Sequence, residues 1–151
     1  MVLAGKPLYV GSFRHNLDAK NRLTIPARWR FAGDEKGEHY LALPHPDGYV
    51  LVLPPFEVEK LYATVSAKLL SDRDAQDFLN KFFAHAIEFG PDKQGRIGLP
   101  DELLRHAGVA KEAVLVGTMT KFGIWSPDRW AQVQSRASDD GLAALMHRIG
   151  I

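Results

Sequence analysis

The sequence DAKNRLTIP at residues 18–26 occurs a second time, in altered form, as DKQGRIGLP at residues 92–100, 74 positions further along the chain. Both copies contain an Asp, an Arg four residues later, two aliphatic residues separated by one position, and a closing Pro. We interpret this match as an internal duplication. The chain is therefore expected to hold two structural units of the same design.

Each copy predicts a tight turn followed by a short strand. Asn21 and Gly95 occupy the same place in the two copies, and these residue types tolerate a positive φ better than others. The apolar-polar-apolar segments at residues 23–25 and 97–99 alternate as half-buried strands do. The Pro that follows ends the strand and suits the first turn of a helix. In both turns the Asp is close enough to orient the Arg guanidinium or to accept loop amides, and the basic side chains are expected at the tip.

Strand and helix patterns alternate around these two turns. Strands are expected at residues 8–17, with an interruption near Gly11 and Ser12, and at residues 22–25, 40–43, 49–53, 86–89, 96–99, 113–116 and 122–125. Helices are expected at residues 26–31, 56–70 and 100–107, from Ser126 with Pro127 at its first position, and in the tail within 138–151. Ser71 and Asp74 resemble a capping box that opens a further helix. The fold class predicted from these elements is α+β, with a mainly β core and flanking helices.

The helix after Ser71 carries an apolar stripe at helical spacing. Its members are Ala75, Phe78, Leu79, Phe82, Phe83 and Ala86. A lone helix could not leave such a face in water, so we interpret the stripe as buried core or as a seam between subunits rather than as a surface for stacking bases. Trp29, Trp125 and Trp130 are likewise expected to be packing residues.

The composition excludes several kinds of site. The chain has 151 residues, of which 46% are hydrophobic, and this is enough to bury a core in one domain or in two small ones. The absence of Cys excludes a disulfide framework, thiolate catalysis and Cys-based zinc sites. The six histidines show no metal-ligand spacing, so no metal, no cofactor and no catalytic residue is expected. No apolar run is long enough to span a membrane or to act as a secretion signal, and a cytoplasmic protein is expected.

The placement of charge distinguishes the two copies. The formal net charge is only +1, so an argument for an anionic partner depends on where the charges lie. Residues 14–30 contain five basic residues and one acid, whereas residues 92–105 contain three of each. We therefore expect the first copy to dominate contact with a nucleic acid.

Three segments taken together resemble the MraZ family, bacterial transcriptional regulators of the division and cell-wall gene cluster. These are residues 15–26 (HNLDAKNRLTIP), 92–96 (DKQGR) and 122–126 (FGIWS). The tandem repeats of that family resemble the swapped-hairpin DNA-binding fold of AbrB. The resemblance implies two tandem AbrB-like swapped-hairpin β-barrel units that form a pseudo-symmetric monomer. The implied boundaries are residues 12–58 for the first repeat, 59–84 for a helical linker, 85–131 for the second repeat and 132–151 for a C-terminal tail.

The same resemblance implies a cytoplasmic, nucleoid-associated regulator that binds short direct repeats in double-stranded promoter DNA. MraZ proteins assemble into closed rings, so a homo-oligomeric ring of the octamer or dodecamer class is implied. Carried over by position, the DNA-binding residues are Arg14, Lys20, Asn21, Arg22, Lys93, Gln94 and Arg96, and Asp18 and Asp92 brace the turns. Asn21 stands where the family usually has Gly, which keeps the turn feasible but changes its tip.

The residues also leave simpler and different functions open. Arg22 and Arg96 could each form only an ion pair with the preceding Asp, which contributes about 0–1 kcal/mol when exposed. An antitoxin-like swapped-hairpin module, whose chief partner is a protein, is the alternative function. A hydrolase acting through Asp18 and Asp92 is a third, although no nucleophile with a partner base accompanies these carboxylates.

Overall fold

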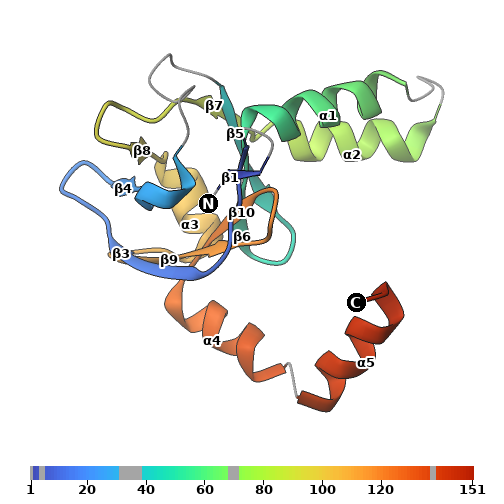
Figure 1. The fold of residues 1–151 in the computed structure, drawn as a ribbon. Helices are drawn as coiled ribbons and strands as arrows, with labels where there is room; N and C mark the ends of the chain where they lie inside the picture. Colours follow the sequence, from blue (N-terminus) through green and yellow to red (C-terminus); the bar gives the residue numbers. More distant parts are fainter. Residues whose placement is uncertain (1, 4–5, 31–38, 68–71, 137–138) are drawn as a thin grey trace.

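Most strands belong to one six-stranded antiparallel sheet (Figure 1). The computed structural model describes residues 2–3, 6–30, 39–67, 72–136 and 139–151. In spatial order, the sheet contains β3 (Ser12–Asn16), β9 (Glu112–Gly117), β10 (Phe122–Trp125), β6 (Tyr49–Leu53), β5 (Tyr40–His45) and β7 (Ile87–Phe89). Two further pairs lie outside this sheet: β4 (Arg22–Thr24) with β8 (Arg96–Gly98), and β1 (Val2–Leu3) with β2 (Lys6–Pro7).

The two copies exchange strands within the sheet. β3, which precedes the first turn, pairs with β9, which follows the second turn. β7, which precedes the second turn, pairs with β5, which follows the first. In the separate ribbon formed by β4 and β8, Leu23 lies opposite Ile97, the residue 74 positions later. The strands β3, β5 and β6 of the first copy correspond to β7, β9 and β10 of the second. When each strand is replaced by its counterpart, the strand order of the sheet is simply reversed, as expected for an internal duplication.

The six-stranded sheet is open. Among the described strands β3 and β7 are its edges, and no closed barrel is formed. β4 and β8 are three residues long and bond to each other rather than to those edges, so the ladder does not continue around the molecule. The barrel closure implied by the family resemblance is therefore absent from the described strands, and the fold is mixed α/β with antiparallel sheets.

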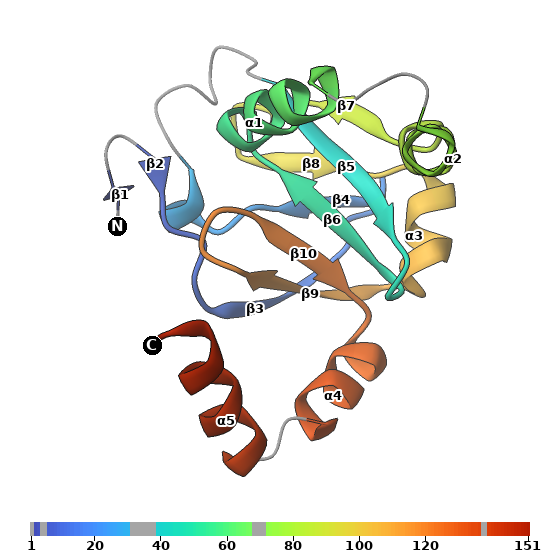
Figure 2. The same cartoon turned by 90° about the vertical axis from the view of Figure 1, so that its right-hand side faces the viewer.

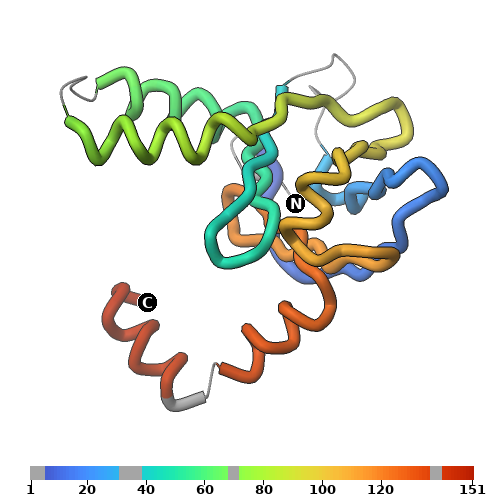
Figure 3. Tube along the Cα trace, turned by 180° about the vertical axis from the view of Figure 1, so that it is seen from behind, coloured from blue at the N-terminus to red at the C-terminus, as the bar shows by residue number. Residues whose placement is uncertain are grey.

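The described residues contain five α-helices, some of which project away from the sheets (Figure 2). They are α1 (Pro55–Ser66), α2 (Arg73–Phe83), α3 (Asp101–Ala107), α4 (Pro127–Arg136) and α5 (Asp139–Ile149). α1 and α2 form a hairpin that projects from one side of the sheets, and α4 with α5 leads away at another (Figures 1 and 3). The turns that carry the basic residues lie on neither projection.

Local signals predict the ends of two helices correctly. α3 is followed by Gly108 in the left-handed conformation, with φ of 70°, as the Gly at that position predicts. α4 begins at Pro127, and the Oγ of Ser126 accepts a hydrogen bond from the backbone N–H of Arg129 at 3.2 Å.

Two other local predictions need correction, and the interruption expected in the first strand is present. The N-cap of α2 is Asp72, whose side chain accepts a hydrogen bond from the Ala75 N–H at 3.1 Å, and the expected cap Ser71 lies outside the described residues. The segment predicted as a helix at residues 26–31 contains only a 3₁₀ helix, Ala27–Trp29, because the backbone of Arg30 is already extended, with ψ of 148°; residue 31 lies outside the described range. The strand expected at residues 8–17 is interrupted at Gly11, which has a φ of 96°, and its second part is β3.

The core lies between the six-stranded sheet and the β4–β8 ribbon. Leu23 and Ile97, at the centre of the ribbon, are fully buried. Trp29 packs on the rings of Phe122 and Tyr9, with centroid distances of 5.1 and 5.5 Å. Complete burial of side chains of this size contributes about 1.5–3 kcal/mol each. The core therefore holds the ribbon against the sheet and leaves its other face outward.

The apolar stripe of α2 is only partly covered. No residue of α1 or α2 is buried, and Phe78 is 50% exposed. Phe82 and Phe83 line an apolar pocket of about 530 Å³ beside β5 and β6. The prediction that this stripe is buried core is wrong for Phe78 in the single chain, whereas a seam between subunits stays a prediction.

Candidate nucleic-acid interface

The first turn is organised by one carboxylate. Oδ1 of Asp18 accepts hydrogen bonds from the backbone N–H groups of Lys20 and Arg22, both at 2.9 Å. Oδ2 of Asp18 accepts a hydrogen bond from Nε of Arg22 at 2.7 Å. Asn21 has a φ of 56°, the positive value that its position in the turn predicts. One side chain thus satisfies the loop amides and orients the guanidinium, while Lys20 stays exposed at the tip.

The second turn repeats this geometry. Asp92 accepts hydrogen bonds from the N–H groups of Gln94 and Arg96 at 3.0 and 2.9 Å, and from Nε of Arg96 at 2.7 Å. Gly95 has a φ of 77°. The same residue types at the same spacing therefore give the same turn, and Lys93 is exposed as Lys20 is.

The β4–β8 ribbon brings the two arginines to one face. Arg22 lies opposite Gly98, and Arg96 lies opposite Thr24. Opposed residues in an antiparallel pair share a face and successive residues alternate, so both arginines face outward while the residues between them face the core. An offset of two residues along the strands and one strand spacing across them places the two arginine Cα atoms about 8 Å apart. Figure 1 shows the β3–β4 and β7–β8 loops, which carry the turns, projecting from the same side of the molecule.

Both turn aspartates are held in the ionised form. The hydrogen bond from the Arg22 N–H is the largest cause that lowers the pKa of Asp18 below its usual value, and the Arg96 N–H does the same for Asp92. Partial desolvation opposes the shift, and the arginine side chains add to it. Carboxylates stabilised as anions are poorly suited to act as general acids near neutral pH. This geometry argues against the hydrolase alternative.

Comparison with known proteins places the chain in a family. The family described as "MraZ protein, putative antitoxin-like" matches residues 82–149. The protein named Transcriptional regulator MraZ in Alkaliphilus metalliredigens is 34% identical over 146 residues, which cover 95% of this chain and 100% of that protein. The chain belongs to the MraZ family. The relative of the same name in Halothermothrix orenii is 33% identical over 146 residues, which cover 95% of this MraZ-family chain and 100% of that protein. The one in Lactobacillus gasseri is 36% identical over 133 residues, which cover 88% of this chain and 91% of that protein. The resemblance expected from the turn motifs is thereby confirmed.

The arginines of the two turns differ in whether their terminal nitrogens are already hydrogen-bonded. Nη2 of Arg96 donates a hydrogen bond to Oε1 of Gln94 at 2.7 Å. In the described part of the chain the terminal nitrogens of Arg22 make no hydrogen bond, and only its Nε is engaged by Asp18. Arg22 can therefore bind an incoming acceptor without first breaking a contact at its terminal nitrogens.

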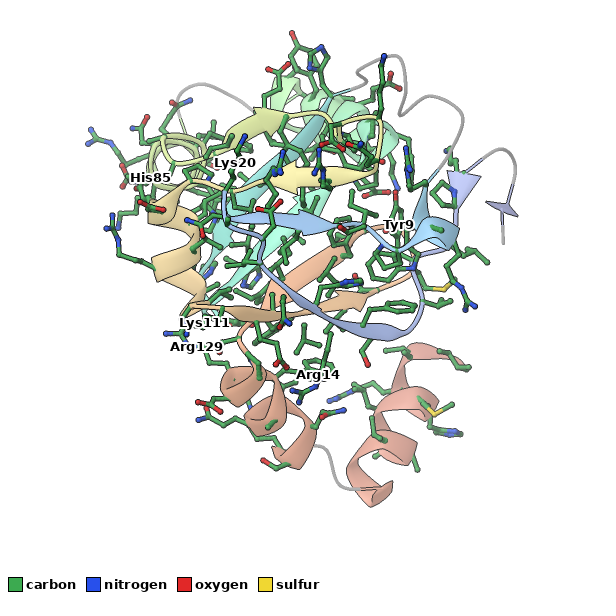
Figure 4. All side chains as sticks on the ribbon, turned by 90° about the vertical axis from the view of Figure 1, so that its left-hand side faces the viewer. Tyr9, Arg14, Lys20, His85, Lys111 and Arg129 are labelled. Carbon is green, nitrogen blue, oxygen red and sulfur yellow. The ribbon has the colours of Figure 1, made fainter. Side chains whose placement is uncertain are left out.

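Arg14 does not join the turn residues. It lies on β3, where its Nη1 pairs with Oε1 of Glu112 at 2.6 Å, and its side chain is 64% exposed. Figure 4 shows Arg14 at the end of the molecule that carries α4, apart from Lys20. The structure therefore brings together six of the seven residues expected to bind DNA, while Arg14 occupies a different surface.

Two residues outside the turns, Asp101 and Arg30, hydrogen-bond to them, and neither contact can be predicted from the sequence. Nδ2 of Asn21 donates to Oδ1 of Asp101 at 3.3 Å, across 80 positions of sequence. Nη2 of Arg30 donates to the backbone carbonyl of Lys93 at 3.3 Å, across 63 positions. Contacts over such distances have no local signal. The sequence does show that the two copies differ at this place, because Arg30 corresponds to the apolar Leu104, 74 positions later.

The described residues contain neither a metal-binding cluster nor a membrane-spanning helix. Within the described ranges, no group of three or more His, Asp or Glu side chains is arranged to hold a metal ion. Among the described helices, none combines the length and the apolar character that crossing a membrane requires.

Proposed function

We propose that this chain is a sequence-specific DNA-binding regulator of transcription whose paired turns contact double-stranded promoter DNA. The observation that carries the proposal is the outward face of the β4–β8 ribbon, on which Arg22 and Arg96 lie about 8 Å apart with an exposed lysine beside each. The name Transcriptional regulator MraZ, borne by the relatives, supports the same role.

The residues of the turns divide between base and backbone contact. An Arg guanidinium can bind O6 and N7 of guanine with two parallel hydrogen bonds, whereas a Lys ammonium is a point charge suited to phosphate. We assign base contact to Arg22 and phosphate contact to Lys20. Asn21, Lys93, Gln94 and Arg96 contribute to the same surface. Asp18 and Asp92 contact no DNA themselves and brace the turns.

We further propose that the chain consists of two AbrB-like swapped-hairpin repeats, residues 12–58 and 85–131, with a helical linker at 59–84 and a tail at 132–151. One pair of turns spans too few base pairs for useful specificity, so affinity requires several copies on one DNA. A homo-oligomeric ring of the octamer or dodecamer class, bound head to tail, would match direct repeats. Such a regulator would act at the nucleoid in the cytoplasm, by occupying promoters of the division and cell-wall gene cluster.

The experiment that tests this function compares two arginine variants in a gel-shift assay at fixed salt. The DNA is a sequence selected from a random pool by the unaltered protein. Arg22→Ala should abolish the specific complex. The control Arg73→Ala removes the same charge from the exposed first turn of α2, and it should bind as the unaltered protein does. Equal affinity of the Arg22→Ala variant would reject the assignment.

A protein-binding function is the second candidate. The matching family is described as antitoxin-like, and the apolar pocket beside α2 offers a surface for a protein segment. Stoichiometric co-purification with a small toxin, combined with no salt-dependent retention on DNA, would favour this function over promoter binding.

A further inference from the structure

The two turns are built alike but are supported by different side chains from the opposite copy. Asn21, at the tip of the first turn, is exposed and donates to Asp101 at the start of α3. Gly95, in the same place of the second turn, has no side chain to donate and is buried. The side chain of Arg30 covers it instead. The second turn therefore depends on a residue of the first copy that has no equivalent at the first turn.

The contact between Arg30 and the second turn is close. A Cβ atom added to Gly95 would lie 2.9 Å from Cδ of Arg30 and 3.0 Å from its Nε and Cζ. A Cβ atom essentially never lies as close as 2.9 Å to another heavy atom, and 3.0 Å is tighter than most Cβ contacts, so a side chain fits here only if the arginine moves. Nη2 of Arg30 donates to the carbonyl of Lys93, the residue that presents the exposed ammonium of this turn. The guanidinium thus lies across the backbone of the turn and bonds it at one point.

Packing alone does not account for an arginine here. Nε of Arg30 is buried and has no hydrogen-bond partner among the described residues, which is unfavourable for a charged group. The second copy has Leu104 at the corresponding position, 95% buried, where an apolar side chain fills the space without that penalty. What the arginine adds is the bond to Lys93 and the close cover over Gly95.

We propose that Arg30 is a positioning residue, which holds the second turn in the conformation that contacts DNA. The role in DNA binding rests on the function proposed above, whereas the effect on the turn does not. In this role Arg30 acts through the turn, because its Nε is buried and its Nη2 is directed at the backbone of Lys93. Its replacement should loosen residues 92–96 and leave residues 18–22 unchanged.

Hydrogen exchange of the full chain without DNA tests the effect on the turn. Arg30→Leu, which copies the residue of the second repeat, should speed exchange of the peptide covering 92–96 about fivefold, the factor expected for the loss of one hydrogen bond. The peptide covering 18–22 should be unaffected. Arg28→Leu is the matched control, since Arg28 is exposed on the 3₁₀ helix that ends directly before Arg30, and it should change neither peptide. Unchanged exchange at 92–96, or equal acceleration of both turns, would overturn the proposal.

A double-variant cycle tests the pairing of Arg30 with Gly95. Gly95→Asn introduces the residue found in the first turn, which tolerates the positive φ but places a Cβ against Arg30. Gly95→Asn should lower the Tm of the parent chain and should lower the Tm of the Arg30→Leu variant much less. The double variant has Asn in the turn and Leu beside it, as the first turn has with Asn21 and Leu104. Equal losses of Tm in the two backgrounds would contradict close contact. Should Arg30→Leu fail to fold, Arg30→Lys keeps the stem and charge but not the planar fork, and it should still speed exchange at 92–96.

DNA binding separates this proposal from the proposed function. Arg30→Leu should weaken binding to the selected DNA, and the same substitution should have a smaller effect when Lys93 and Arg96 are both replaced by Ala, because it acts through the second turn. If Arg30→Leu speeds exchange but leaves affinity unchanged, the positioning role is wrong. If the unaltered protein does not bind DNA in a salt-dependent way, the proposed function fails, while the exchange and Tm results still decide whether Arg30 holds the turn.

Discussion

Alanine at Arg22 should weaken DNA binding more than alanine at Arg96, although the two arginines occupy equivalent places. A bidentate contact to a guanine contributes about 1–3 kcal/mol of discrimination. Arg22 can make it with free terminal nitrogens. Arg96 must first release the 2.7 Å hydrogen bond to Gln94, which costs about 0.5–1.5 kcal/mol. The loss of affinity on Arg96→Ala should therefore be about fivefold smaller than the loss on Arg22→Ala.

The assay is fluorescence anisotropy at fixed salt, with a labelled duplex that carries the selected site. Gln94→Ala supplies the internal control because it removes the acceptor that holds Arg96. In the Gln94→Ala background, the effect of Arg96→Ala should grow toward that of Arg22→Ala. Equal losses for the two arginines in the parent chain, with no change on removing Gln94, would refute the reasoning.

Three further results are expected. Lys20→Ala should reduce the slope of log K against log salt by about 0.9, the value for one phosphate contact, whereas Arg73→Ala should leave the slope unchanged. Because the folded-state pKa values of Asp18 and Asp92 are lowered, their contribution to stability is complete above about pH 4 and is lost as the pH falls through the folded-state values. Acid unfolding of the Asp18→Asn variant should accordingly show a weaker dependence on pH below about 4 than that of the unaltered protein. Leu23→Ala, at a fully buried position of the ribbon, should cost about 2–5 kcal/mol, or roughly 4–20 °C of Tm by thermal unfolding, and a loss below 1 kcal/mol would mean that the ribbon is not part of the core.

The turns could be predicted from the sequence because their causes are local. An Asp, an Arg four residues later, and an Asn or Gly between them are sufficient to give the hydrogen bonds and the positive φ that both turns have. The hairpin strands and the cap at Ser126 follow from equally short patterns. The duplication also predicts that the turns belong to two equivalent units.

The contacts that join the copies could not be predicted, since they depend on tertiary packing. Nothing near β3 in the sequence indicates that it pairs with β9 rather than with a strand of its own copy. The sequence indicates only that Arg30 belongs to a basic segment, whereas in the structure its side chain lies over Gly95. The exposure of Phe78 could not be predicted, because helical periodicity identifies an apolar face but not what covers it.

The central claim is that the two turns are the surface that meets DNA. Hydrogen exchange with and without a duplex selected from a random pool measures this directly in the full chain. We predict slower exchange in the peptides that cover residues 18–22 and 92–96, with little change in α1 and α2. Slower exchange confined to α1 and α2, with both turns unchanged, would contradict it.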